Sequence, residues 1–368
     1  MTSICLCMIV RNESAVIERC LSAVSDLIAY WVICDTGSTD GTPELIRQAL
    51  DGQPGELHEA PWVDFGHNRS ELMARARGKA DYLLLIDADM TVTYQKLEVS
   101  ALTADSYLLR HEESPEYWIK RLVRGDREWR YVGATHEYIT TDGEERTEKL
   151  DAIVIHHHAD GGARPEKFAR DLALLATELD RNPNDPRAAF YLAQTYRDMD
   201  RLEEAIELYR RRASMGGWEE EAFYSLYQAG VLSERAGDHS AAVSALLEAW
   251  DARPSRAEPL YELAWMFRAR GRHHSAHMVA DRGRSIPVPD DTLFVHRWVY
   301  EWGLLFEYSI AAYWVGRPRA ALDACDSLLA MSQLPDAYRS QTQANRVYCV
   351  KALAQAAASR QPTVSRTR

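Results

Sequence analysis

The stretch Tyr82-Leu83-Leu84-Leu85-Ile86-Asp87-Ala88-Asp89-Met90 decides the fold. Its short apolar run, bounded by polar residues, is typical of a strand buried on both faces of a parallel sheet. Ligands bind at the carboxyl ends of strands in open α/β sheets, so Asp87 and Asp89 are predicted to lie beside a ligand. Carboxylates two residues apart share one side of a strand end and can both reach one divalent cation, Mg²⁺ or Mn²⁺. Taken alone, the pair fits an acidic turn equally well.

The composition indicates an acidic protein with a packed core and two domains, or at most three. The 368 residues are 46% hydrophobic and carry a net charge of −12, which argues against binding to nucleic acid or to an acidic membrane surface. No segment approaches the ~18 apolar residues of a membrane span, and the N-terminal apolar run is too short for a signal peptide. The six cysteines form no Cys-x-x-Cys pair, as expected of buried, reduced thiols in a cytoplasmic protein.

Upstream of the two aspartates, predicted strands alternate with predicted helices. Strands are expected at 4–10, at 31–34 and around 56–60, and a helix follows each of them. Thr42 is predicted to cap the second helix, with Pro43 at its first position. This alternation predicts a doubly wound, Rossmann-like and mostly parallel sheet.

Charged side chains gather where these strands end: Arg11, Glu13, Asp35, Asp87 and Asp89. Such a cluster at one sheet edge is typical of a nucleotide site, where an acidic residue after the second strand accepts hydrogen bonds from a ribose or a base. Arg69 could pair with a phosphate through two hydrogen bonds. A dinucleotide-binding Rossmann site is excluded, because no Gly-x-Gly-x-x-Gly follows the first strand, and there is no Walker P-loop.

Four blocks of sequence together resemble family 2 glycosyltransferases of the GT-A fold. In chain order they are Met8-Ile9-Val10-Arg11-Asn12-Glu13, Asp35-Thr36-Gly37-Ser38-Thr39-Asp40-Gly41-Thr42, Asn68-Arg69 and Ile86-Asp87-Ala88-Asp89. The order and spacing of the blocks both match, over about the first 160 residues. The resemblance implies an α/β GT-A domain that acts as an inverting transferase, with a nucleotide-sugar donor and a divalent cation, Mn²⁺ or Mg²⁺.

The same resemblance implies a donor-binding set of residues: Val10, Arg11, Glu13, Asp35, Asn68, Arg69 and Asp87. The residues after the first strand would line the nucleoside pocket. Asp35 would bind the base, and Arg69 would approach the ribose and the phosphate. Asp87 and Asp89 would face the ribose and the metal, so Asp89 is both a metal ligand and part of the catalytic set.

A hairpin is predicted at 106–110 and 117–123, and a second motif follows it. The stretch Tyr131-Val132-Gly133-Ala134-Thr135-His136-Glu137 resembles one found in a glycosyltransferase branch with C-terminal helical repeats, which includes enzymes that glycosylate bacterial peptides. Inverting transfer needs a base beside the acceptor hydroxyl or thiol, and Glu137 is the candidate. The usual Glu-Asp pair of the family is absent, and His136 and Glu137 could instead fix the loop.

Three histidines end another apolar strand, predicted at 150–155. GT-A enzymes often take a third metal ligand from a histidine near the end of the domain, and imidazole can ligate Mn²⁺. Strand alternation puts His156 and His158 on one face and His157 on the other. His156 and His158 are therefore the predicted metal ligands, beside the alternative that they only form hydrogen bonds at a strand end.

Helices are predicted from about residue 166 onward, after the break Gly161-Gly162-Ala163-Arg164-Pro165. Small residues recur at matching points of a loose repeat: Ala205, Ala242, Ala276 and Ala321. The first two intervals, 37 and 34 residues by subtraction, are typical of tetratricopeptide repeats, and the longer third interval contains an insertion around 285–295. We therefore expect a GT-A domain at 1–162, an all-α repeat domain at 163–360 and a flexible tail at 361–368.

The leading hypothesis is a metal-assisted inverting glycosyltransferase. Its partners would be a nucleotide-sugar donor and a peptide, protein or glycan acceptor held by the helical repeats, whose concave face suits extended peptides. The repeats could also brace the first domain or form a homodimer. The alternative hypothesis is a repeat scaffold with an inactive GT-A domain. A sugar nucleotidylyltransferase is disfavoured, because the loop after the first strand lacks the required glycines.

Overall fold

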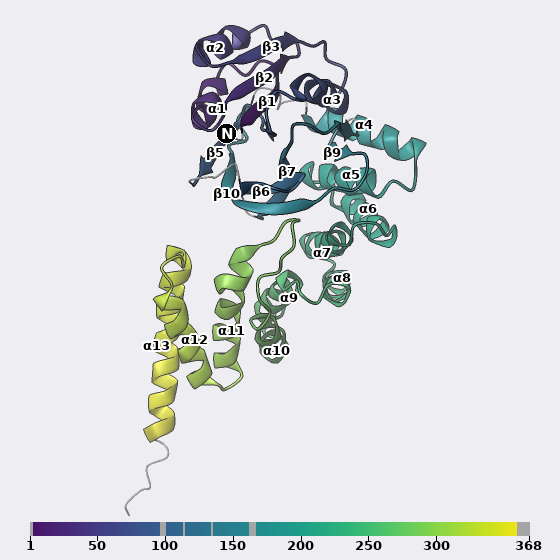
Figure 1. Ribbon diagram of the computed structural model, residues 1–368. Coiled ribbons are helices and arrows are strands. Elements are labelled where there is room, and N and C mark those ends of the chain that lie inside the picture. Colours follow the sequence, from purple (N-terminus) through teal and green to yellow (C-terminus); the bar gives the residue numbers. More distant parts are fainter. Residues whose placement is uncertain (1–2, 96–100, 113–114, 134, 162–166, 359–368) are drawn as a thin grey trace, which may run out of the picture. The chain divides into compact units, whose positions relative to one another are not determined.

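The computed structural model describes residues 3–95, 101–112, 115–133, 135–161 and 167–358. The predicted tail at 361–368 lies outside the described residues. The first half contains an eight-stranded sheet in the order β3-β2-β1-β4-β7-β6-β10-β5, with a separate hairpin β8-β9 (Figure 1). The strands are β1 (Ile4–Val10), β2 (Tyr30–Asp35), β3 (Gly55–Glu59), β4 (Tyr82–Leu85), β5 (Met90–Tyr94), β6 (Ser106–His111), β7 (Tyr117–Arg124), β8 (Trp129–Val132), β9 (Tyr138–Thr141) and β10 (Thr147–His157).

The directions of the strands bring many strand ends to one edge of the sheet. Strands β1 to β4 are parallel to one another, β7 is antiparallel to both β4 and β6, β10 is parallel to β6, and β5 is antiparallel to β10. The carboxyl ends of β1, β2, β4, β6 and β10 therefore lie at the same edge as the amino ends of β7 and β5. The predicted mostly parallel α/β sheet is confirmed, with antiparallel pairs in its second half.

Two layers cover the sheet. Helices α1 (Ile17–Val24) and α2 (Thr42–Ala49) pack on one face, and α3 (Phe65–Ala76) packs on the other together with the β8-β9 hairpin (Figure 1). The predicted N-cap of α2 is wrong by one residue. Gly41 holds the cap position at φ 89°, and Thr42 is the first helical residue. The hydroxyl of Thr42 instead accepts a hydrogen bond from the amide of Glu13 (2.9 Å), which ties the loops after β1 and β2 together.

The second half consists of helical pairs: α4 (Lys167–Arg181), α5 (Pro186–Asp198), α6 (Leu202–Ser214), α7 (Glu219–Arg235), α8 (His239–Ala252), α9 (Glu258–Ala269), α10 (His273–Gly283), α11 (Leu304–Trp314), α12 (Pro318–Ala330) and α13 (Asp336–Ala358). A π-helical turn, Val299–Gly303, precedes α11. The turns within four pairs contain residues in the left-handed conformation: Asp200, Gly237, Gly271 and Gly316. The four repeating alanines are at most 1% exposed. Both features confirm the predicted repeats, and the predicted insertion falls in the non-helical segment after α10.

The chain divides into two compact units, and the division does not fall at the predicted boundary. The first unit is Met1–Arg201 with Thr292–Phe294, and the second is Leu202–Asp291 with Val295–Arg368. Strands give way to helices near residue 162, as expected, but α4 and α5 belong to the sheet unit. The reason is a set of contacts to the loop before β9, including a hydrogen bond from Thr135 to Asp171 on α4 (3.3 Å) and ring stacking of His136 on Tyr191 of α5.

Two further findings concern the whole described chain. All six cysteines are buried and free, as the sequence predicts. Among the described residues, no helix combines the length and apolarity that crossing a membrane requires.

Candidate active site at the strand ends

Asp89 and His157 form the central pair of the site. Asp89 follows β4 and His157 ends β10, and the Asp89 Oδ2 and His157 Nε2 atoms are 3.2 Å apart. Two neighbouring ligands of one octahedral cation are also about 3 Å apart, since each lies ~2.1 Å from the metal. Carboxylate oxygen is a ligand that suits Mn²⁺ and Mg²⁺, and imidazole is a ligand that suits transition-metal ions. The described residues contain no group of three or more acidic, histidine or cysteine side chains arranged to hold a metal, so other ligands would come from phosphate and water.

The structure places the two predicted histidine ligands elsewhere. The Nε2 atoms of His156 and His158 lie 2.9 Å and 2.8 Å from the hydroxyls of Thr93 and Thr91 on β5. The predicted alternation is right, because these two histidines do share a face. The pairing of β10 with β5 turns the third histidine, His157, towards Asp89, so His157 is the histidine that lies beside this carboxylate.

The charge state of Asp89 follows from its surroundings. Burial would raise the pKa of this carboxyl, but the hydrogen bond and the charge of His157 outweigh burial and lower the pKa. The carboxylate is therefore ionised at neutral pH. This is the state in which it could bind a cation.

Asp87 is held by two arginines. Its Oδ1 atom is 2.5 Å from Arg69 Nη2, and its Oδ2 atom is 3.3 Å from Arg121 Nη2. Arg69 also lies against Glu137, with 2.7 Å between Nε and Oε1. The Arg69–Glu137 contact is an ion pair rather than an aligned hydrogen bond. The guanidinium of Arg69 thus joins the strand-end aspartate to the candidate base, and Asp89 rather than Asp87 remains for a cation.

His111 is a further residue at this edge that sequence patterns do not single out. It ends β6, is fully buried, and its ring stacks on Tyr117 at 4.6 Å. Burial, followed by the positive charge of Arg121, lowers the pKa of His111 to about 2. The imidazole is therefore neutral and adds no charge beside Asp87.

The loops after β1 and β2 are joined by side-chain hydrogen bonds. Asp35 accepts hydrogen bonds from the amides of Gly37 (3.2 Å) and Ser38 (3.0 Å). Asn12, at φ 55°, accepts one from the amide of Thr39 (2.8 Å). Asp35 therefore shapes the turn in which it lies, and its role in binding the base stays a prediction.

Three other residues predicted to bind the donor differ in how far they are buried. Val10 is buried at the end of β1, and Arg11 beside it is exposed. Asn68 is fully buried, donates to the carbonyl of Pro61 (3.0 Å) and accepts from the amide of Val63 (2.9 Å). Asn68 thus fixes the loop before α3.

A segment after β10 lies against Asp89. A Cβ atom on Gly161 would come within 3.2 Å of Asp89 Oδ2 and also within 3.2 Å of Glu13 Oε2. The preceding residue, Asp160, forms a two-point ion pair with Arg19 of α1 (2.7 and 2.8 Å). Glu13 is therefore close to the Asp89–His157 pair, and its donor-binding role stays a prediction.

Gly66 provides a test of how tightly this site is packed. A Cβ atom at Gly66 would lie 2.3 Å from the carbonyl oxygen of Gly133, in the loop that leads to Glu137. Alanine is favoured over glycine within helices by about 1 kcal/mol. We nevertheless expect Gly66→Ala to lower the melting temperature, because the new methyl group would collide with the backbone of Gly133. His67→Ala, at an exposed position one residue on, is the control, and a Gly66→Ala variant at least as stable as wild type would contradict the close packing.

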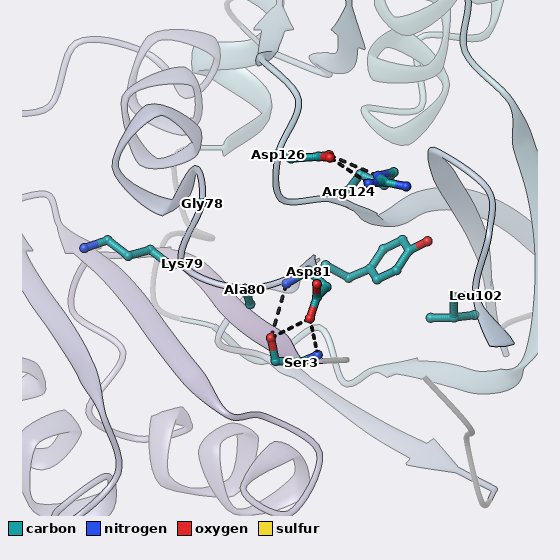
Figure 2. Close-up of a pocket in the computed structure, with 9 residues that line it drawn as sticks. Ser3, Gly78, Lys79, Ala80, Asp81, Leu102, Arg124 and Asp126 are labelled. Atoms are coloured by element: carbon teal, nitrogen blue, oxygen red, sulfur yellow. Dashed lines mark hydrogen bonds and ion pairs between the residues drawn. The ribbon is translucent and has the colours of Figure 1, made fainter. Parts of the chain in front are cut away.

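The opposite edge of the sheet holds a separate hollow that offers no comparable chemistry. Figure 2 shows its lining residues, in which Asp81 faces Ser3 and Arg124 pairs with Asp126. The Asp81 carboxylate accepts from the amide and the hydroxyl of Ser3 at 2.7 and 2.9 Å. The charged groups of Asp81 and Arg124 are thus each paired within the hollow, which lies at the amino end of β4 and away from Asp89.

The sheet order and its charged strand ends define a GT-A-type α/β domain, and comparison with known proteins identifies its family. Residues 5–107 match the family described as "Glycosyl transferase family 2". The N-terminal part of the chain is a family 2 glycosyltransferase domain, and tetratricopeptide-like helical repeats follow it.

Two curated proteins show how far the similarity extends. The chain is 27% identical over 312 residues to "TPR repeat-containing protein Synpcc7942_0270" of Synechococcus elongatus (strain ATCC 33912 / PCC 7942 / FACHB-805), covering 77% of this chain and 72% of that protein. It is 24% identical over 224 residues to "SPbeta prophage-derived glycosyltransferase SunS" of Bacillus subtilis (strain 168), covering 55% of this chain. The match spans 51%, about half, of the length of SunS.

Solved structures of helical repeat proteins are more distantly similar. "Crystal structure of MamA protein" has a TM-score of 0.36 at 19% identity, covering 46% of this chain and 90% of that one. "Crystal structure of YrrB: a TPR protein with an unusual peptide-binding site" has a TM-score of 0.35 at 11% identity, covering 51% and 84%. At these values the repeat assignment depends on the helices and turns of the chain itself.

Proposed function

We propose that the chain transfers a sugar from a nucleotide-sugar donor to an acceptor hydroxyl or thiol, with inversion at the anomeric carbon. The observation that supports this best is the Asp89–His157 pair, 3.2 Å apart at the carboxyl ends of β4 and β10, within a family 2 glycosyltransferase domain. The nucleoside would lie over the ends of β1 and β2, beside Val10, Arg11 and Glu13.

The donor's diphosphate would lie beside Asp89 and His157. A divalent cation bound there would offset the negative charge that develops on the leaving diphosphate. Asp89 would contribute an ionised carboxylate, and His157 would contribute a ring nitrogen after giving up its proton as the cation binds. Arg69 and Arg121 hold Asp87 in place next to this position.

Glu137 is the proposed general base. In the transfer step, the acceptor oxygen or sulfur bonds to the anomeric carbon, the bond to the diphosphate oxygen breaks, and Glu137 takes the acceptor's proton. Arg69 pairs with both Glu137 and Asp87, so the carboxylates of these two residues lie on either side of one guanidinium group. Glu137 is thus close to the strand ends where the donor would bind.

The acceptor is proposed to be a peptide, a protein or a glycan, and the helical repeats are proposed to bind it. Repeat solenoids offer extended concave surfaces that suit chain-like partners. Among the aromatic side chains of the repeats, Tyr224 and Tyr227 are buried, at 3% and 5% exposure. Trp218, 44% exposed, remains available for contact with an acceptor.

A panel of nucleotide-sugars tests the proposal. Each would be incubated with the protein and Mn²⁺, and both donor hydrolysis and the shift in melting temperature would be measured. We expect one nucleoside class to raise the melting temperature and one of its sugars to be hydrolysed, because water can replace the acceptor. If no donor is hydrolysed and no nucleoside diphosphate binds, the alternative of a repeat scaffold with an inactive GT-A domain is favoured.

A further inference from the structure

The loop that carries Glu137 has a strained backbone. His136, directly before the proposed base, adopts a φ of 50°. A non-glycine residue in this left-handed region is strained, and it persists only where surrounding contacts hold it there. The loop therefore depends on its neighbours for its shape.

Helix α5 supplies those contacts. Arg187 donates two hydrogen bonds to the carbonyl oxygen of His136, from Nε at 3.0 Å and from Nη2 at 2.9 Å. The imidazole of His136 stacks on the ring of Tyr191, with centroids 4.0 Å apart and planes 8° apart. Because Arg187 and Tyr191 are four residues apart on one helix, they lie on the same face, and together they hold both the backbone and the side chain of His136.

The guanidinium of Arg187 is itself held in place. Its carbon lies 5.2 Å from the ring centroid of Tyr138 and 4.9 Å from that of Tyr191. The start of α5 is fixed by Asp185, whose side chain accepts from the amides of Arg187 (2.9 Å) and Ala188 (3.0 Å). Planar stacking together with a two-point hydrogen bond is geometry that arginine provides and lysine does not.

We propose that Arg187 and Tyr191 are positioning residues for the transfer reaction: they clamp the strained loop so that Glu137 stays against Arg69. This inference rests on the proposed role of Glu137 as base. It assigns a task in catalysis to helix α5, which lies in the same compact unit as the sheet. The clamp acts on His136, and Glu137 directly after it pairs with Arg69 at 2.7 Å.

The variants that test the clamp are Arg187→Lys, which keeps the charge but loses the two-point bond, and Tyr191→Leu, which removes the stacking partner. Arg319→Lys on α12 is the matched control, because it alters an exposed arginine that pairs with Asp323 at 3.1 Å. Hydrogen exchange of the amides at 135–138 would be measured first, together with the melting temperature. We expect exchange there to become at least tenfold faster in both variants and unchanged in the control; unchanged protection in a folded variant overturns the proposal.

Kinetics separate positioning from a merely structural role. Kinetics would be measured with Mn²⁺ and the nucleotide-sugar that wild type hydrolyses in the panel. We expect the kcat of Arg187→Lys and Tyr191→Leu to fall about 10–100-fold, the range seen when outer-shell support is lost. Their affinity for UDP or GDP should stay unchanged. Arg187→Lys should cost no further activity in a Glu137→Gln background, because both changes disable the same group. The proposal would be overturned if the activity losses of Arg187→Lys and Glu137→Gln were additive in the double variant. It would also be overturned if the variants lost only nucleotide affinity. If wild type hydrolyses no donor, the proposed function fails, and the exchange measurement alone decides on the clamp.

Discussion

Donor turnover is expected to fall at least about a hundredfold in Asp89→Asn and in His157→Ala, a loss comparable to that of a key electrostatic group at other active sites. Both side chains lie at strand ends, 3.2 Å apart, and both would have to bind the same cation beside the leaving diphosphate. Neither belongs to the apolar core, so the melting temperature should change little. Initial rates of donor hydrolysis with Mn²⁺ measure the effect.

The neighbouring histidines provide matched controls for this prediction. His156→Ala and His158→Ala change the same residue type on the same strand, but these side chains face Thr93 and Thr91 rather than Asp89. We expect both variants to keep near wild-type turnover. Equal losses in all three histidine variants, or full activity in His157→Ala, would contradict the Asp89–His157 site.

Arg69→Met is expected to lower the free energy of unfolding by about 3 kcal/mol, the low end of the range for breaking a buried ion pair. It leaves Glu137 without its cation, while Asp87 keeps Arg121. The control is Arg47→Met, which removes an exposed pair with Glu44 at 3.5 Å and should change stability little. Urea unfolding at pH 7 gives both values, and equal effects of the two variants would contradict a buried network.

The effect of Arg69→Met should depend on pH in a defined direction. Burial would raise the pKa of Asp87, but the charges of Arg69 and Arg121 outweigh burial and hold the pKa well below its usual value of about 4. The stabilisation is therefore complete above the unfolded-state pKa and is lost as the pH falls through the lower folded-state pKa. We expect the difference between wild type and Arg69→Met to be full at pH 7 and to shrink below about pH 4. A difference that grew on acidification would contradict the ion pairs.

The sequence was informative wherever a local pattern determines structure. Strand runs such as Tyr82–Leu85, the helix Phe65–Ala76 and the repeating alanines follow from periodicity and turn chemistry, and the structure confirms them. Within the site, the charged strand ends follow from the alternation of strands and helices. Each of these predictions uses information contained within one segment of the chain.

What could not be predicted depends on pairing between distant segments. Alternation separates His157 from His156 and His158, but only the register of β10 against β5 determines which face meets Asp89. Arg121 reaches Asp87 because β7 lies antiparallel beside β4, and no local pattern marks it. Likewise, the assignment of α4 and α5 to the sheet unit depends on contacts of single side chains with the loop before β9.

Binding of a nucleoside diphosphate with and without Mn²⁺ tests the central claim most directly. Calorimetric titration of UDP and of GDP into wild type, Asp89→Asn and His156→Ala needs neither the correct sugar nor the acceptor. The site at Asp89 and His157 predicts that one nucleotide binds wild type and His156→Ala in a Mn²⁺-dependent manner, and that Asp89→Asn loses this dependence. Binding that is equally tight without the cation, or that Asp89→Asn leaves intact, would contradict a metal-assisted donor site at these strand ends.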